Sequence, residues 1–226
     1  MAKQESIEHL IAHSDLHYIA VEGVIGAGKT TLATKLGETV GARVVLEQFE
    51  ENPFLKDFYR DQERYAFQTQ IFFLLTRYKQ QRNLLQRDLF QQILVTDYIF
   101  EKDKIFAYLN LQDEELKLYE TLITSIEHNI ATPDLVVYLQ SNVERLMLNI
   151  RERGRSFETH MSEQYIKDLA EAYNYFFFRY KATPLLIVNA TEIDFVGNLE
   201  HYDDLVREIF RPSRAPVEYY NPRRGG

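Results

Sequence analysis

The sequence predicts an α/β protein with one parallel β-sheet of five strands and helices on both of its faces. Short apolar segments alternate along the chain with longer segments of helical periodicity, a pattern typical of right-handed βαβ units. The chain has 226 residues, of which 45% are hydrophobic, and this suffices for one sizeable core. Neither an internal repeat nor a linker divides the chain, so we expect a single domain.

The five strand segments are short and apolar, as expected for strands that are buried on both faces of a parallel sheet. Charged or turn-forming residues bound them: the third ends at Asp97, and Pro133 opens the fourth. The strands are expected at residues 17–22, 44–46, 93–96, 133–139 and 185–188.

The helical segments carry apolar residues three or four positions apart, with polar residues between them. In the longest segment, for example, Phe67 and Ile71 lie one turn apart. We expect Gly41 to end the first helix and Ser141 or Asn142 to cap the fourth. The helices are expected at residues 29–36, 63–90, 99–130 with a break near 110–113, 143–151, 163–179 and 202–210.

The composition argues against several classes of protein. Lys and Arg number 26 against 34 Asp and Glu, a net charge of -8, whereas nucleic-acid and anionic-membrane binders need a basic surface. The absence of cysteine excludes disulfides, thiolate nucleophiles and cysteine zinc sites. No apolar run reaches the roughly 18 residues of a membrane helix, and residues 1–6 lead to no apolar signal core. We expect a cytoplasmic protein with no nucleic-acid partner and no membrane partner.

A phosphate-binding motif lies between the first strand and the first helix. Residues 23–30 match the pattern G-x-x-x-x-G-K-S/T. Glycines in this loop let backbone N–H groups converge on phosphate oxygens, and the helix N-terminus adds a favourable dipole. Lys29 is expected to reach the β- and γ-phosphates, and the Thr30 hydroxyl to bind Mg²⁺. The nucleotide-binding residues predicted in this segment are Gly23, Val24, Ile25, Gly26, Ala27, Gly28, Lys29, Thr30 and Thr31.

This motif sharpens the fold prediction to a three-layer P-loop fold and sets the expected limits of the domain. We expect residues 17–210 to form the P-loop domain, preceded by an N-terminal extension at residues 1–16. The segment 211–226 contains prolines at 212, 216 and 222 and ends in two glycines, so we expect it to be a loosely ordered tail.

Carboxylates end the second and third predicted strands, at Glu47 and Asp97. Ligands of an open parallel sheet bind beyond the carboxyl ends of its strands, so both acids should lie near the P-loop. One carboxylate can take a proton from an attacking hydroxyl, and the other can hold Mg²⁺ together with Thr30. The alternative for each acid is a solvated position in a loop.

Three arginines surround Gly154, at positions 151, 153 and 155. A glycine break would release them from the preceding helix into a loop, where their guanidinium groups could close over phosphates as an arginine-rich lid. The alternative is a solvated run of charges. Gln70 and Arg77 are seven residues apart, which places them on one face of a helix, two turns apart.

Together these motifs resemble the deoxynucleoside kinase family, the P-loop group that includes deoxyguanosine, deoxyadenosine and deoxycytidine kinases. The resemblance extends from Tyr18 to Phe210. It rests on the P-loop, on Glu47 followed by Asn52-Pro53-Phe54-Leu55, on Phe67-Gln68-Thr69-Gln70 with Arg77, on Asp97, on Arg153-Gly154-Arg155 with Glu158, and on Asp194-Phe195.

The resemblance implies a role for each of these residues. Glu47 would be the general base for the nucleoside 5′-hydroxyl, and Glu158 would contact the sugar 3′-hydroxyl. Either Gln70 or Gln68 would bind the base, and Arg77 with Asp103 would read its edge. The implied catalytic set is Glu47, Lys29, Arg153 and Arg155. The implied substrate-binding set is Glu47, Phe54, Tyr65, Gln68, Gln70, Arg77, Asp97, Tyr98, Asp103 and Glu158. Arg151, Arg153, Asp194 and Phe195 would complete the ATP site, and Thr30 with Asp97 would bind the metal.

Two positions depart from the family pattern. Many members carry an arginine directly after the strand-end acid, where this chain has Tyr98. Many also carry an arginine four residues before Arg153, where this chain has Asn149, with Arg151 as a possible substitute. These departures concern the cations that stabilise the transition state.

The predicted function is the ATP- and Mg²⁺-dependent phosphorylation of the 5′-hydroxyl of 2′-deoxynucleosides in nucleotide salvage. The Asp97-Tyr98 pair and the Arg77/Asp103 pair favour deoxyguanosine or deoxyadenosine. The alternatives are a nucleoside monophosphate kinase and a regulatory module that binds ATP without turnover. The resemblance also implies a homodimer that packs helices near residues 63–90 and 105–130 across a two-fold axis.

Overall fold

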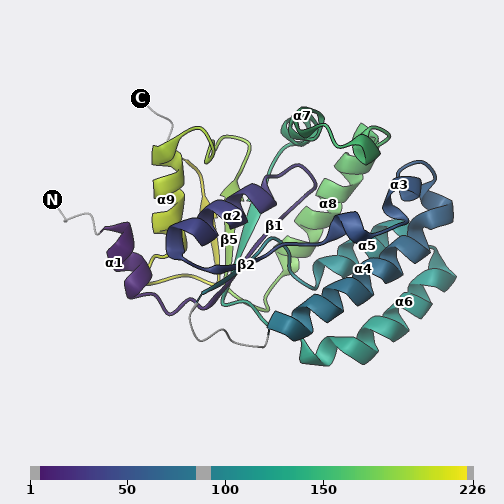
Figure 1. Cartoon of the computed structure of the whole chain (residues 1–226), viewed down its shortest axis with the longest axis horizontal. Helices are drawn as coiled ribbons and strands as arrows, with labels where there is room; N and C mark the ends of the chain where they lie inside the picture. The colour runs from purple at the N-terminus through teal and green to yellow at the C-terminus, as the bar shows by residue number, and fades with distance from the viewer. Residues whose placement is uncertain (1–5, 85–92, 223–226) are drawn as a thin grey trace.

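The structure, a computed structural model, describes residues 6–84 and 93–222 (Figure 1). Its sheet has six parallel strands in the order β2-β3-β1-β4-β5-β6. The strands are β1 (Tyr18–Gly23), β2 (Arg43–Val45), β3 (Leu94–Thr96), β4 (Leu135–Gln140), β5 (Leu185–Asn189) and β6 (Val217–Tyr220). The predicted α/β class and parallel sheet are therefore confirmed, but the predicted number of five strands is wrong.

Helices cover both faces of this sheet. Figure 1 shows α1, α2 and α9 on one side and α4, α5, α6 and α8 on the other. The α-helices are α1 (Ile7–Ala12), α2 (Lys29–Val40), α3 (Leu55–Phe58), α4 (Gln62–Leu84), α5 (Lys102–Asn110), α6 (Asp113–Ile126), α7 (Val143–Arg153), α8 (Glu163–Arg179) and α9 (Leu199–Ile209), and the short 3₁₀ helices are η1 (Phe49–Glu51), η2 (Glu127–Asn129) and η3 (Ser156–Glu158). In residues 6–84 and 93–222 we find no helix that is both long and apolar enough to cross a membrane.

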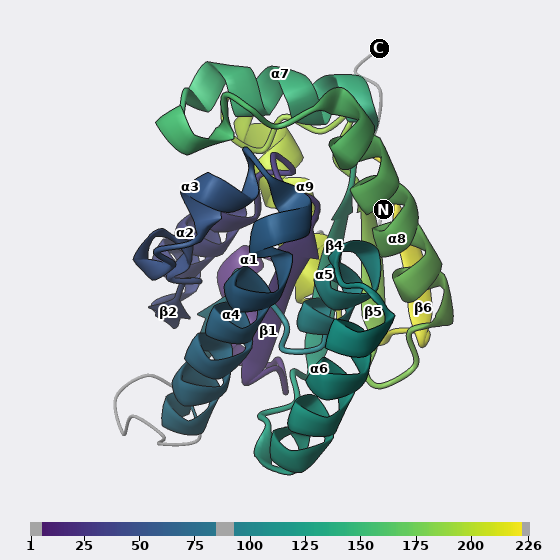
Figure 2. The same cartoon turned by 90° about the vertical axis from the view of Figure 1, so that its right-hand side faces the viewer.

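The core lies where the apolar strands require it. Strands β1 and β4 are buried along almost their whole length, because helices pack on both faces of the sheet. Strand β1 lies between β3 and β4, so the loop that follows it emerges at the centre of the sheet. Helix α7 lies across this end of the molecule (Figure 2).

The C-terminal end of the chain differs from the expectation. Residues 217–220 of the predicted loose tail form β6, which pairs in parallel with β5. The prolines at 216 and 222 flank this strand and do not interrupt it, and its half-exposed pattern is that of an edge strand. The N-terminal extension contains α1, which packs on α9. The sheet therefore reaches beyond the predicted domain limit at residue 210.

Most other elements lie where the sequence places them. The predicted break near residues 110–113 separates α5 from α6, and the Asn142 side chain caps α7 by accepting a 2.8 Å hydrogen bond from the Arg145 N–H. Residues 85–90, the end of the long predicted helix, lie outside the described residues. The short elements α3, η1 and η3 are absent from the prediction, because three or four residues do not show helical periodicity.

Candidate active site

The phosphate-binding loop needs its glycines for two separate reasons. Gly26 and Gly28 have φ angles of 88° and 94°, in the region that favours glycine. A Cβ atom at Gly26 would lie 2.7 Å from the Leu146 carbonyl oxygen, and one at Gly28 would lie 2.9 Å from the Phe195 ring. The loop therefore packs closely between α7 and the segment around Phe195.

Lys29 begins α2 and turns back over the loop. Its Nζ donates hydrogen bonds to the carbonyl oxygens of Gly23 at 2.7 Å and Val24 at 3.2 Å. Burial, with a contribution from the nearby Lys102, lowers the pKa of Lys29 to about 8. The ammonium group is therefore held at the loop by backbone oxygens.

Asp97, at the end of β3, connects the loop to the end of β2. Its Oδ2 accepts a 2.5 Å hydrogen bond from the Thr30 hydroxyl, and its Oδ1 accepts a 2.7 Å bond from the Glu47 N–H. In the described part of the chain no three His, Cys, Asp or Glu residues are grouped as metal ligands. Mg²⁺ is typically bound by one or two protein oxygens and by substrate phosphates, so the hydroxyl and carboxylate oxygens of this pair fit that ion.

Glu47 is held between two cations. Arg77 donates to its Oε1 from Nε at 2.7 Å and approaches it with Nη2 at 2.6 Å, and the Lys102 Nζ donates to its Oε2 at 2.7 Å. Burial acts to raise the pKa of Glu47, but these two cations outweigh it and lower the pKa to about 2. The side chain is therefore a firmly oriented carboxylate.

Asp103 lies behind the wall of the site and not on its surface. It is fully buried and pairs with Arg77, and its Oδ2 accepts from the Gln70 amide at 2.8 Å and the Tyr119 hydroxyl at 2.9 Å. Burial raises its pKa, against the lowering effect of Arg77 and its hydrogen bonds. The structure thus places Asp103 as an anchor for Arg77 and Gln70, which do line the cavity beside Glu47.

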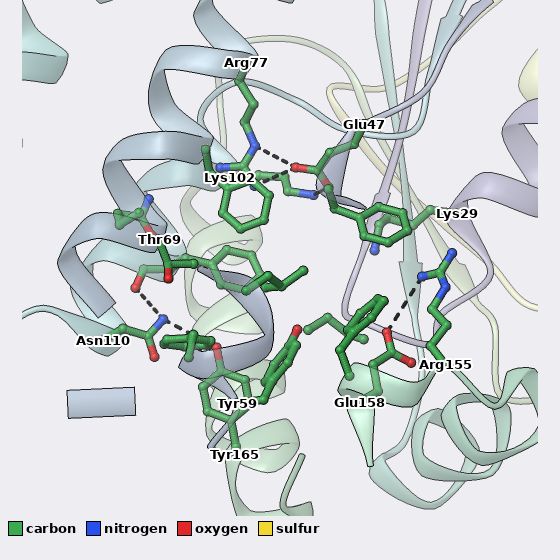
Figure 3. Close-up of a pocket in the computed structure, with 18 of the residues that line it drawn as sticks. Lys29, Glu47, Tyr59, Thr69, Arg77, Lys102, Asn110, Arg155, Glu158 and Tyr165 are labelled. Carbon is green, nitrogen blue, oxygen red and sulfur yellow. Dashed lines mark hydrogen bonds and ion pairs between the residues drawn. The ribbon is translucent and has the colours of Figure 1, made fainter. Parts of the chain in front are cut away.

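These groups face a central cavity between α3, α4, α5 and α8 (Figure 3). Lys29, Glu47, Arg77 and Lys102 lie at one end of it in Figure 3, and a polar end formed with Thr69 and Asn110 lies opposite. The walls are aromatic and consist of Phe49, Phe58, Tyr59, Phe73, Phe106, Phe157, Tyr165 and Tyr173. Flat apolar walls with polar groups suit a flat heteroaromatic ring.

Arg151 and Arg153 lie in the last turn of α7 and only Arg155 follows Gly154, so the predicted release of all three arginines into a loop is wrong. The helix end and the segment after it close one side of the central cavity. Arg153 donates from Nε and Nη2 to the two carboxylate oxygens of Glu158, at 2.8 and 2.6 Å. Arg155 lies 3.7 Å from the same carboxylate, and its guanidinium stacks on the Phe49 ring at 4.2 Å from the ring centroid. Glu158 is buried and lines the cavity with both arginines, so the structure brings these three predicted residues together.

A second depression, the P-loop cleft, lies on the other side of the loop. The predicted ATP-site residues that line it are Gly26, Ala27, Gly28, Thr31, Arg153, Asp194 and Phe195. Asn149 also lines it and donates a 2.7 Å hydrogen bond to the Gly26 carbonyl oxygen. Arg151 is exposed and lines neither the cleft nor the cavity, whereas Arg145, which the sequence analysis did not single out, lines the cleft.

Besides Asp103, four predicted substrate-binding residues do not line the central cavity, and their positions correct the prediction. Gln68 points away because it is two residues from Ala66, on the opposite side of α4, and donates to the Arg64 carbonyl oxygen. Tyr98 is fully buried, and no hydrogen-bond partner of its hydroxyl occurs among the described residues. Phe54 and Tyr65 are half-buried, and other residues of α3 and α4 take the lining positions.

Several residues of the cavity were not predicted from the sequence, above all Lys102. One signal for it was available: a lysine at the start of a helix faces the positive end of the helix dipole, an unfavourable place for a cation without a specific partner. Thr69 and Asn110 gave no comparable signal, because only the folded chain brings them together.

Comparisons with known proteins agree with this geometry. The chain is 32% identical over 197 residues to the deoxyguanosine kinase of Bacillus subtilis, covering 85% of this chain and 95% of that protein. It is 28% identical over 209 residues to the deoxyadenosine/deoxycytidine kinase of the same organism, covering 89% and 94%. Its structure resembles that of deoxyadenosine kinase from M. mycoides with bound dATP, with a TM-score of 0.76 and 25% identity over 85% of this chain and 98% of that chain.

The sequence model of deoxynucleoside kinases matches residues 19–212, which include both strand-end acids, the P-loop and the arginine lid. A match of this extent, together with these relatives, shows an enzyme that phosphorylates deoxynucleosides. The chain belongs to the deoxynucleoside kinase family.

Proposed function

We propose that this enzyme transfers the γ-phosphoryl group of ATP to the 5′-hydroxyl of a purine 2′-deoxynucleoside, deoxyguanosine or deoxyadenosine. One observation carries the assignment of the site: the Glu47 carboxylate, held by Arg77 and Lys102, shares the central cavity with Lys29 and Thr30 of the P-loop. The deoxynucleoside would occupy this cavity, and ATP the P-loop cleft.

The proposed chemistry needs few groups. The 5′-oxygen bonds to the γ-phosphorus, the bond from phosphorus to the departing ADP oxygen breaks, and the hydroxyl proton passes to Glu47. A carboxylate with a pKa of about 2 is a weak base. It would therefore orient the hydroxyl and accept its proton late, in a loose transition state. Lys29, Arg153 and Arg155 would balance the charge of the transferring group.

We assign the metal site to Thr30 and Asp97, which stand in contact at the edge of the loop. Mg²⁺ bound there would neutralise charge on the β- and γ-phosphates. The substitution Asp97→Asn should raise the Mg²⁺ concentration needed for half-maximal activity, which a titration measures. An unchanged Mg²⁺ requirement would reject this assignment.

The base would be selected around Gln70. Its amide nitrogen already donates to Asp103, which leaves the amide oxygen to accept a hydrogen bond from a base N–H. The purine preference agrees with the kinase of Bacillus subtilis named for deoxyguanosine, although its deoxyadenosine/deoxycytidine kinase is also similar. Initial rates with the four deoxynucleosides test this part of the proposal.

The same assays separate the two alternatives. A nucleoside monophosphate kinase would phosphorylate deoxyguanosine 5′-monophosphate and not deoxyguanosine. A regulatory module would bind ATP and form no product. We expect ADP and the monophosphate to appear in equal amounts from ATP and the deoxynucleoside.

We also propose a homodimer formed through α4, α5 and α6. Leu75, Tyr108, Leu118 and Leu122 are exposed on these helices, and such apolar side chains are typical of interface cores. Light scattering should give twice the chain mass, and Leu75→Glu with Leu122→Glu should reduce it to one chain. A monomeric wild-type protein would reject the dimer. The cytoplasmic location stays a prediction.

A further inference from the structure

Lys102 is a buried cation in the central cavity to which neither the P-loop motif nor the arginine lid assigns a role. Only 3% of its surface is exposed, and it begins α5. Its Nζ donates to Glu47 Oε2 at 2.7 Å and lies 4.0 Å from Glu22 Oε1. It lines the cavity with Lys29, Thr30 and Asp97, at the end nearest the P-loop.

A purely structural role as counter-ion of Glu47 and Glu22 does not explain why this ammonium group is buried here. Arg77 already contacts Glu47 through two nitrogens. Glu22 accepts hydrogen bonds from the N–H groups of Gly23 and Ile99 at 2.9 and 3.0 Å and from the Tyr173 hydroxyl at 3.3 Å. Both carboxylates would keep partners without Lys102. Burying an ammonium group at a helix N-terminus is unfavourable, so its place in the cavity calls for a further partner.

The donors of Lys102 are only partly used. An ammonium group has three N–H donors. One of them serves Glu47, and the 4.0 Å separation from Glu22 is too long for a hydrogen bond. The remaining donors lie beside the carboxylate that would hold the 5′-hydroxyl. Position 98, next to Asp97, provides no positive charge there because it is a buried tyrosine.

We propose that Lys102 is a catalytic residue that binds the transferring phosphoryl group while it holds Glu47. This inference rests on the proposed function, because it needs the 5′-hydroxyl at Glu47. The ammonium group donates to Glu47 and to a phosphoryl oxygen together, which brings the attacking oxygen and phosphorus into line and offsets negative charge in the transition state.

Three substitutions separate charge from position. Lys102→Met removes both charge and donor, Lys102→Gln keeps a donor for Glu47 without charge, and Lys102→Arg keeps charge and donors. Lys104→Met is the matched control, since Lys104 lies on the same helix and pairs with Glu127 at a partly exposed site. Thermal melts identify folded variants, and kcat and KM are measured for ATP and for the preferred deoxynucleoside.

We expect kcat to fall about 10²–10³-fold in Lys102→Met and Lys102→Gln, as for other groups that stabilise transition-state charge. The KM for ATP should stay within about threefold, Lys102→Arg should recover at least about tenfold of kcat, and Lys104→Met should match the wild type. If Lys102→Met does not fold, Lys102→Gln and Lys102→Arg decide.

The proposal is overturned if Lys102→Gln retains kcat within about threefold, because Lys102 would then only position Glu47. It is also overturned if Lys102→Arg is no better than the uncharged variants, or if only the KM for the deoxynucleoside rises. A wild-type protein that phosphorylates none of the four deoxynucleosides would instead reject the proposed function.

Discussion

Glu47 holds two cations with one carboxylate, so a change at this position acts on both chemistry and folding. Glu47→Gln should lower kcat about 10²–10⁴-fold, the range for loss of a general base, with a smaller effect on the deoxynucleoside KM. It also leaves Arg77 and Lys102 buried without their shared counter-ion, which costs on the order of 3–5 kcal/mol. Steady-state kinetics and urea unfolding measure the two effects. Glu50→Gln, at an exposed neighbour, should change neither, and a loss of kcat below threefold would show that Glu47 is not the base.

Lys29 makes ATP binding depend on pH, because burial, together with Lys102, lowers its pKa to about 8. Phosphates bind the charged form, so affinity should be maximal below this pH and should fall as the pH rises through it. Binding near pH 8 should take up about half a proton, which calorimetry in buffers of different ionisation enthalpy detects. Lys29→Arg stays charged and should show no such uptake. Equal ATP affinity at pH 7 and about pH 9.5 would contradict this account.

Asp103 should affect the activity with every deoxynucleoside, because it anchors both Arg77 and Gln70. The sequence suggested that it reads the base edge, but it is buried behind Arg77 and Gln70. Asp103→Asn weakens the anchor of both residues, and a disturbed buried polar network costs about 1–3 kcal/mol, or roughly a 5- to 150-fold loss of kcat/KM. Rates with the four deoxynucleosides measure this loss. Wild-type rates with all four deoxynucleosides would show that Asp103 does not anchor these residues.

Among the residues of the site, those that a sequence motif or the end of a strand identifies could be predicted, and the others could not. The P-loop fixes Lys29 and Thr30, and the ends of parallel strands bring Glu47 and Asp97 to the same edge. Lys102 follows no such rule, because only the folded chain brings the start of α5 to Glu47 in the loop after β2.

Helix α4 illustrates what periodicity reveals about an element. Ala66, Gln70, Phe73 and Arg77 recur at helical spacing and line the cavity, so the seven-residue interval of Gln70 and Arg77 correctly indicated one face. The four-residue helix α3 provides Leu55 and Phe58 to the same cavity, and Tyr59 follows directly after it. Four residues form little more than one helical turn, so helical periodicity could not reveal α3 in the sequence.

Strand β6 is held to the domain by Arg214. Its Nη2 donates to the carbonyl oxygens of Glu208 and Ile209 at 2.7 Å, at the end of α9, and its Nη1 reaches Glu218 of β6 at 3.2 Å. Arg214→Ala should therefore lower the free energy of unfolding by about 1.5–3 kcal/mol, the usual range for charged hydrogen bonds, and leave kcat unchanged. Arg211→Ala, at a more exposed arginine that also pairs with Glu218, is the control. Equal urea midpoints for both variants would show that Arg214 does not fasten the strand.

At the scale of the whole molecule, the alternation of strands and helices predicted a parallel sheet, but not the place of the last strand. The order of strands puts β1 beside β3, so the P-loop and Asp97 meet at the carboxyl edge where the chain crosses from one side of β1 to the other. The sixth strand escaped prediction because prolines 212, 216 and 222 suggested a loose tail.

The central cavity and the P-loop cleft share Arg153, so they are adjacent compartments. A molecule that joins adenosine to a deoxynucleoside through a chain of phosphates should occupy both. Because the second contact is then intramolecular, it should raise the melting temperature more than ATP and the deoxynucleoside added together at equal concentration. A thermal shift assay measures this increase in melting temperature. An increase no larger than that with ATP alone would mean that the linked molecule does not occupy both compartments.

The position of Arg153 between the two compartments also suggests how hydrolysis of ATP without a deoxynucleoside could be limited. Arg153 is tied by two hydrogen bonds to Glu158, on the side of the cavity assigned to the sugar. A sugar hydroxyl that takes up part of this carboxylate would release the guanidinium toward the triphosphate. A water molecule in place of the 5′-hydroxyl would bring no sugar to Glu158, so Arg153 would stay bound there and hydrolysis of ATP without a deoxynucleoside would be slow. In this arrangement donor and acceptor would both have to be present before Arg153 leaves Glu158 for the triphosphate.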